Sequence, residues 1–235
     1  MKLRLLFSAI AAFVIALPVT PSAEALVING WAPSATALGC VSAGTDGQQS
    51  CVGSNLAGPT DYVLTSWNVY LDPDPAVVGF IAIQNNALVA QTFSFTFLLP
   101  IVAQGPQVQV SGSISGSLTD ANGNGATLNS VAPSVYQAKI DGLTVQTLLN
   151  HPQPPVVAGA FGSTPWGGAG FGPTTLNQTA NSTIAIQVDF TLSPGDLASF
   201  TSVFNVIAVP EPATLVMLSG GLAGLLAFGR RSPRA

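Results

Sequence analysis

Side chains that carry acid–base or nucleophilic chemistry are scarce in this sequence of 235 residues. The single histidine, His151, directly precedes Pro152 in a proline-rich stretch, and no Gly-x-Ser-x-Gly elbow is present. Asp72 and Asp74 alternate with prolines, a spacing that favours an extended turn over a pair of catalytic carboxylates. A catalytic zinc would require two or three histidines. The sequence therefore predicts no enzymatic activity and no cofactor.

One segment has the oxygen-bearing side chains that a hard cation requires. Residues 120–125 match the first half of a calcium-binding loop, in which alternate positions supply ligands and a glycine allows the sharp bend. The candidate ligands are Asp120, Asn122 and Asn124. The twelfth position holds Val131 instead of a bidentate glutamate, and the segment lies where two strands would need a connection. We expect a hairpin turn between Thr119 and Ala126, with a calcium site as the weaker alternative.

The only two cysteines, Cys40 and Cys51, lie close together in a stretch rich in glycine, serine and glutamine. In an exported chain, two cysteines at this spacing are expected to form one local disulfide bond. The alternative is a pair of free thiols, and no neighbouring cation is present to lower a thiol pKa. We therefore expect a Cys40–Cys51 disulfide.

The charge of the middle of the chain excludes one class of function. Between Leu26 and Ala208 the sequence has no glutamate, and Lys139 is the only cation. The eight acids in this range are Asp46, Asp61, Asp72, Asp74, Asp120, Asp141, Asp189 and Asp196. A region with a net charge of about −7 has no basic patch to neutralise phosphates, so we expect no binding of nucleic acid.

These residues must be positioned by strands, because apolar and polar residues alternate with a period of two along the middle of the chain. No amphipathic helical stretch of useful length interrupts residues 26–208. The predicted strands are Tyr62–Tyr70, Val77–Gln84, Phe93–Phe97, Gln107–Thr119, Val135–Ile140, Leu143–Leu149, Ile184–Leu192 and Leu197–Ala208. Strands with one apolar face require two facing sheets. The sequence therefore predicts an all-β, antiparallel, jelly-roll-like β-sandwich over residues 26–208.

Turn-forming residues separate these runs. Asn85-Asn86, Asp141-Gly142 and the segment 193–196 all contain residues that tolerate the positive φ angles of tight hairpin loops. The sequence therefore predicts a succession of hairpins.

The segment 151–175 differs from the rest, because it is rich in proline and glycine and carries three aromatic residues. We expect a long loop, which in a compact domain is usually functional or disordered. The aromatic ligand candidates are Phe161, Trp166 and Phe171. They would either form a platform that stacks on sugar rings or, in the favoured interpretation, pack onto the sandwich.

The two ends of the chain carry targeting signals. Residues 1–25 combine a short basic region, an apolar helical stretch and a small-residue pattern that ends at Ala25, which predicts a cleaved secretory signal peptide. Residues 213–229 form an apolar run of about 25 Å as a helix, which is close to the roughly 30 Å of a bilayer core. Because arginines follow directly, this end would stay in the cytoplasm.

The tail, residues 209–235, resembles the PEP-CTERM sorting signal of Gram-negative bacteria. The resemblance rests on three ordered elements: Pro210-Glu211-Pro212, the apolar run 213–229, and the basic pair Arg230-Arg231. In that family the apolar run is a transmembrane helix, and an exosortase-type membrane protease is thought to recognise and process the tail. A permanent C-terminal anchor is the alternative.

The resemblance implies where the protein acts. Members are exported, tethered to the inner membrane before processing, and then found at the cell surface or in the extracellular polysaccharide matrix. We expect a structural or adhesive role in exopolysaccharide or biofilm. The alternative is a polysaccharide-binding module that uses the aromatic segment 151–175, with calcium as a further possibility.

Overall fold

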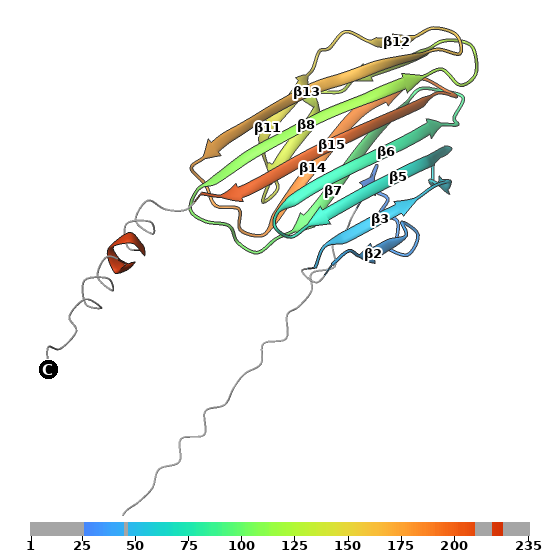
Figure 1. The fold of residues 1–235 in the computed structure, drawn as a ribbon. Helices are drawn as coiled ribbons and strands as arrows, with labels where there is room; N and C mark the ends of the chain where they lie inside the picture. The colour runs from blue at the N-terminus through green and yellow to red at the C-terminus, as the bar shows by residue number, and fades with distance from the viewer. Residues whose placement is uncertain (1–25, 45–46, 210–217, 223–235) are drawn as a thin grey trace, which may run out of the picture.

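Two antiparallel β-sheets lie face to face in the computed structural model, which describes residues 26–44, 47–209 and 218–222 (Figure 1). The chain forms these strands because its apolar residues alternate with polar ones, so that each strand has one face for the interior. The strands are β1 (Val27–Ile28), β2 (Cys40–Ser42), β3 (Gln49–Gly53), β4 (Leu56–Ala57), β5 (Tyr62–Asp72), β6 (Ala76–Asn85), β7 (Gln91–Pro100), β8 (Val108–Thr119), β9 (Ala126–Ser130), β10 (Ser134–Ile140), β11 (Leu143–Asn150), β12 (Val156–Ala158), β13 (Ser163–Leu176), β14 (Thr183–Leu192) and β15 (Leu197–Ala208).

The strand order identifies the architecture. One sheet has eight strands in the order β13-β8-β15-β6-β5-β3-β2, with β4 on β5. The other has seven, in the order β1-β7-β14-β10-β11, with β9 and β12 attached beside β14. Eight long strands follow β5, namely β6, β7, β8, β10, β11, β13, β14 and β15. When these strands are numbered one to eight in this order, the neighbours are 1-8-3-6 in the larger sheet and 2-7-4-5 in the other. This is the order of a jelly roll, and it confirms the predicted all-β antiparallel sandwich.

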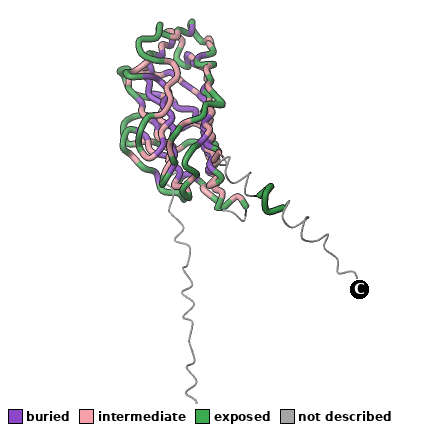
Figure 2. The backbone as a smooth tube through the Cα atoms, turned by 90° about the vertical axis from the view of Figure 1, so that its left-hand side faces the viewer, coloured by how far each residue is buried: buried purple, intermediate pink, exposed green. Residues whose placement is uncertain are grey.

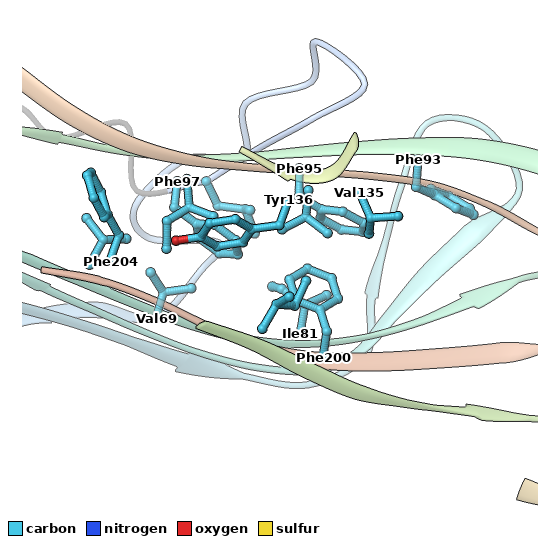
Figure 3. Close-up of a cluster of buried hydrophobic side chains, with 14 of the residues drawn as sticks. Val69, Ile81, Phe93, Phe95, Phe97, Val135, Tyr136, Phe200 and Phe204 are labelled. Carbon is cyan, nitrogen blue, oxygen red and sulfur yellow. The ribbon is translucent and has the colours of Figure 1, made fainter. Parts of the chain in front are cut away.

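Buried residues fill the space between the sheets (Figure 2), and most of the largest fully buried side chains are aromatic (Figure 3). Phe95 of β7 packs edge-on against Phe200 of β15, with ring centroids 5.1 Å apart, and stacks with Phe190 of β14 at 5.7 Å. All three rings are at most 1% exposed. Burying one such side chain contributes about 1.5–3 kcal/mol. Contacts between β7 and β15 also join the two sheets to each other.

Only one of the predicted hairpins with tight turns is present. Asp141 and Gly142 join β10 to its neighbour β11, and both have positive φ angles, 50° and 79°. The hairpin prediction is wrong for Asn85-Asn86, for 193–196 and for 120–125, because each of these segments connects a strand of one sheet to a strand of the other. Loops that cross between sheets need the same turn-forming residues as hairpins, so composition does not distinguish them.

The prediction of a long loop over 151–175 is also wrong. Most of this segment belongs to β12 and to β13, the longest strand, which pairs with β8 at the edge of the larger sheet. The pairing register shifts twice, between Gly167 and Ala169 and between Phe171 and Thr174. An edge strand tolerates prolines and bulges that a central strand would not. The composition that suggested a loop is therefore that of an irregular edge strand.

The predicted signal helix, residues 1–25, lies outside the described residues, as does most of the predicted helix 213–229. Residues 218–222 of that run are helical. Within the described ranges, no helix has the length and apolar character needed to cross a membrane.

Candidate functional site

The predicted disulfide is present and lies at the edge of the larger sheet. Cys40 and Cys51 are bonded, and they occupy directly opposite positions on β2 and β3. Cys51 is fully buried and belongs to the core. The bond therefore ties the first strands of the larger sheet to each other and to the interior.

Asp120, the first calcium candidate, directs its carboxylate into its own loop. It is 2% exposed, and its two oxygens accept N–H groups from Asn122 (3.2 Å), Gly123 (3.0 Å), Gly125 (3.0 Å) and Phe161 (2.8 Å). Burial alone would raise the pKa of Asp120, but these four hydrogen bonds lower it to about 2. The carboxylate thus organises the turn as an anion.

The other two calcium candidates also serve the loop. The side-chain oxygen of Asn122 accepts the backbone N–H of Asn124 at 3.1 Å, and its amide nitrogen donates to Pro194 O at 2.9 Å. The side chain of Asn124 is exposed. Across the described part of the chain, no group of three or more His, Cys, Asp or Glu side chains converges on one point.

Sequence reasoning did not identify the residue that Asp120 contacts. Asp196, in the loop between β14 and β15, is fully buried, and its carboxyl group lies near that of Asp120. The Ser193 hydroxyl donates to Oδ2 of Asp196, whereas Oδ1 has no hydrogen-bond partner. Burial raises the pKa of Asp196, and the neighbouring Asp120 adds to this effect, although the Ser193 hydroxyl and the backbone N–H of Ala121 oppose it. Nothing in the sequence pairs two aspartates that lie so far apart along the chain.

Asn85, at the end of β6, completes this arrangement. It is fully buried, and its side-chain amide donates to the carbonyls of Val89, Leu192 and Ser193 at 3.0–3.1 Å. Its backbone N–H donates to Asp196 O at 2.9 Å. We call Asn85, Asp120 and Asp196 the polar node. Together they join the four loops at one end of the sandwich: 86–90, 120–125, 159–162 and 193–196.

The three aromatic candidates do not form one platform. Trp166 is 6% exposed and packs in the core against Phe190 and Phe200, with centroids 5.7 and 6.3 Å apart. Phe171 is partly buried against Tyr136 and Phe204. Phe161 alone is displayed, with 77% of its surface exposed. Trp166 and Phe171 therefore pack onto the sandwich, as the favoured interpretation expects, whereas Phe161 does not.

The backbone of Phe161 is held in an unfavourable conformation. Its φ angle is +53°, which is uncommon for a bulky residue, and its N–H donates to buried Asp120 at 2.8 Å. The ring lies against Gly123, where an added Cβ would be 2.3 Å from it. The polar node therefore fixes the position of an exposed aromatic ring.

His151 lies beside a small pocket at the flank of the sandwich. The pocket holds about 210 Å³ and is lined by Leu128, Ser130, Val135, Leu149, Gln153, Pro154, Val156, Trp166 and Gly167. Nδ1 of the exposed His151 is 3.0 Å from Ser130 Oγ, which also accepts the N–H of Gln153. A catalytic triad requires a carboxylate on the other ring nitrogen. Within 26–44, 47–209 and 218–222, no carboxylate is hydrogen-bonded to this histidine.

Comparison with known proteins concerns the tail. The family described as the PEP-CTERM protein-sorting motif matches residues 208–232. A search of curated proteins finds no match to the chain. The predicted sorting residues Pro210, Glu211, Pro212, Arg230 and Arg231 all fall in the matched range, outside the described residues. The match begins at the residue where β15 ends.

Proposed function

We propose a role for the β-sandwich from one premise: a PEP-CTERM sorting motif marks this chain as an exported protein sorted through its C-terminus. The proposed role is structural or adhesive, at the cell surface or in the extracellular polysaccharide matrix. The observation that carries the proposal is the match over residues 208–232. Because it begins at Ala208, the last residue of β15, the sorting signal is joined directly to the folded domain.

The motif implies exosortase as the processing partner and a membrane-anchored sorting signal before processing. We infer that the tail is removed and that the sandwich then stays at the surface or is released. We also propose that the domain is not an enzyme. The exposed position of His151, whose ring is hydrogen-bonded to Ser130 and to no carboxylate among the described residues, supports this.

Intact mass spectrometry tests the sorting proposal on protein recovered separately from membranes, surface matrix and medium. We expect the matrix or medium to contain a species that lacks everything after about Pro212. Combined replacement of Pro210, Glu211 and Pro212 by alanine should leave a full-length form in the membrane. The control is Gly159→Ala in the sandwich domain, because a Cβ added at Gly159 would have no other atom within 4 Å. A full-length tail found only in membranes would mean a permanently anchored protein.

A polysaccharide-binding module is a second candidate, favoured by the display of Phe161. An exposed aromatic ring on a fixed backbone loses little entropy when it stacks on a sugar. We assign this role to Phe161, which is 77% exposed, and not to Trp166, which is buried. Phe161→Ala should reduce retention on the producing cell's own exopolysaccharide, measured by affinity electrophoresis. Leu88→Ala, at an apolar residue that is 96% exposed near the same end, should not. Equal retention of both variants and the native protein would remove this candidate.

A further inference from the structure

The pocket beside His151 lies where the edges of the two sheets meet. Strands β9, β10, β11 and β12 of the smaller sheet and β13 of the larger sheet all contribute lining residues. The pocket holds about 210 Å³ and is open to solvent on one side. Pockets for drug-sized ligands measure about 300–1,000 Å³, so this one has room for a single ring or a short group.

The lining of this pocket determines which ligand chemistry fits. Its walls are largely aliphatic and come from Leu128, Val135, Leu149, Pro154 and Val156. Among the described residues that line it, none is charged. A charged ligand would lose its hydration here without gaining a partner of opposite sign, whereas the walls would stabilise a neutral ligand with an apolar group.

Ser130 and Gln153 supply hydrogen-bonding groups to the same pocket. Nε2 of Gln153 donates to Asn150 O at 2.7 Å, which holds the side-chain amide in place, and its Oε1 has no hydrogen-bond partner within the described residues. Oγ of Ser130 is bonded to the N–H of Gln153 and to Nδ1 of His151, each at 3.0 Å. A hydroxyl group can make three hydrogen bonds, so one remains for a ligand whichever tautomer His151 adopts.

Local interactions fix the shape of the pocket. The segment that carries Gln153 is held at both ends, because the N–H of His151 donates to Pro133 O at 3.0 Å and β12 pairs with β9. Leu149 lines the pocket with a φ angle of +56°, which is unfavourable for a bulky residue. Backbone outliers concentrate at ligand sites, where the surrounding structure holds them. A pocket held in this way loses little entropy when a ligand binds.

We propose that this pocket binds one N-acetylated hexose unit of a neutral polysaccharide. The methyl of the acetamido group fits the aliphatic walls, its N–H fits the unpartnered Oε1 of Gln153, and a sugar hydroxyl fits the remaining hydrogen bond of Ser130. Because the pocket is open on one side, the neighbouring units of a polymer would extend into solvent. The choice of a saccharide rests on the proposed matrix function, whereas the pocket and its neutral chemistry do not depend on that function.

The test is an NMR titration of the mature protein with free N-acetylglucosamine and with glucose, which lacks the acetamido group. We expect N-acetylglucosamine to shift the signals of Ser130, Trp166 and the Gln153 side-chain amide, with a roughly millimolar dissociation constant, as is usual for a ligand of this size. Glucose should bind at least about 4-fold more weakly, because it has no methyl group for the aliphatic walls to bury.

Three variants locate the binding. Gln153→Ala removes the acceptor from an exposed residue and should weaken the binding of N-acetylglucosamine about 3- to 10-fold. Gln107→Ala, which removes an exposed glutamine just before β8, is the matched control and should bind like the native protein. Phe161→Ala should also bind the free sugar normally, because Phe161 does not line the pocket.

Several results would overturn the proposal. They are the absence of shifts at the lining residues when the sugar is far above millimolar concentration, equal binding of the two sugars, and equal weakening by Gln153→Ala and Gln107→Ala. Tighter binding of 1-butanol than of N-acetylglucosamine would do the same, because the pocket would then be a purely apolar site. None of these results changes the intact masses that test sorting, so failure of the pocket proposal and failure of the proposed function are distinguishable.

Discussion

Gly116 in β8 shows how the absence of one side chain positions another. Trp166 of β13 and Phe200 of β15 both pair with Gly116, on either side of β8. A Cβ at this glycine would lie 2.6 Å from the indole of Trp166 and 2.2 Å from the carbonyl oxygen of Ser199. The bare backbone of β8 therefore lets the indole lie across the strand and reach the core.

Gly116→Ala should destabilise the domain by about 1–3 kcal/mol, because the backbone carbonyl of Ser199 cannot move aside without disturbing β15. Chemical denaturation followed by fluorescence measures the free energy of unfolding. The matched substitution Gly159→Ala, where nothing lies within 4 Å, should change it by less than about 0.5 kcal/mol. Equal effects at both positions would mean that the indole does not depend on the space above β8.

The sequence identifies the segments that contain Trp166 and Asp120 as candidate sites, but it does not reveal the roles of these two residues. Trp166 stands among glycines and prolines, so nothing local marks it as a core residue; its burial depends on Gly116, which belongs to another strand. Asp120 is recognisable as a loop residue because Asn and Gly follow it. Its contact with Asp196 comes from the topology, which brings the ends of β8 and β14 together. The spacing of residues along the sequence does not reveal such contacts between distant loops.

Strands β2 and β3 are short, and the disulfide between them contributes much of their stability. Replacing both Cys40 and Cys51 by serine should lower the free energy of unfolding by about 2–3 kcal/mol, because the bond restricts a short loop of the unfolded chain. The effect is measured by denaturant titration of the variant against the native protein. The native protein in reductant should approach the variant, whereas the variant itself should not respond to reductant.

The predicted strands differ in how well the sequence describes them. β7, β8, β14 and β15 alternate regularly and were predicted within a few residues of their observed bounds. β13 was missed because its glycines and prolines are compatible with an edge strand and equally with a loop. The sequence predicts hairpins at the crossing loops because a turn signal shows that the chain reverses but not which sheet receives the next strand.

At the scale of the whole molecule, two aspartates at different places in the fold set the response to acid. Asp141 accepts hydrogen bonds from the backbone N–H groups of Asn181, Ser182 and Thr183 at 2.8–3.0 Å. Burial alone would raise the pKa of Asp141, but these bonds hold it well below its ordinary value. Asp120 is held low in the same way. Both carboxylates therefore stabilise the native state only while they are ionised.

These two carboxylates add to the free energy of unfolding at pH values above their ordinary pKa of 3.8. This contribution is lost as the pH falls toward 2. The melting temperature of the native protein should therefore drop steeply between about pH 4 and pH 2. Asp141→Asn should be less stable at about pH 5 and should show a shallower drop, since it has one ionised group fewer to lose. Calorimetry across this range measures both. Identical acid slopes in the two proteins would contradict the assignment.

The junction between β15 and the sorting motif has a mechanical consequence. β15 lies between β6 and β8 in the larger sheet, runs roughly 36 Å from the polar node, and ends at Ala208, where the motif begins. A tension applied to the tail pulls along the axis of this strand. The hydrogen bonds that join β15 to β6 and to β8 are then loaded together in shear, so they do not break one after another. The sorting motif thus follows directly on a strand that is paired along both of its edges.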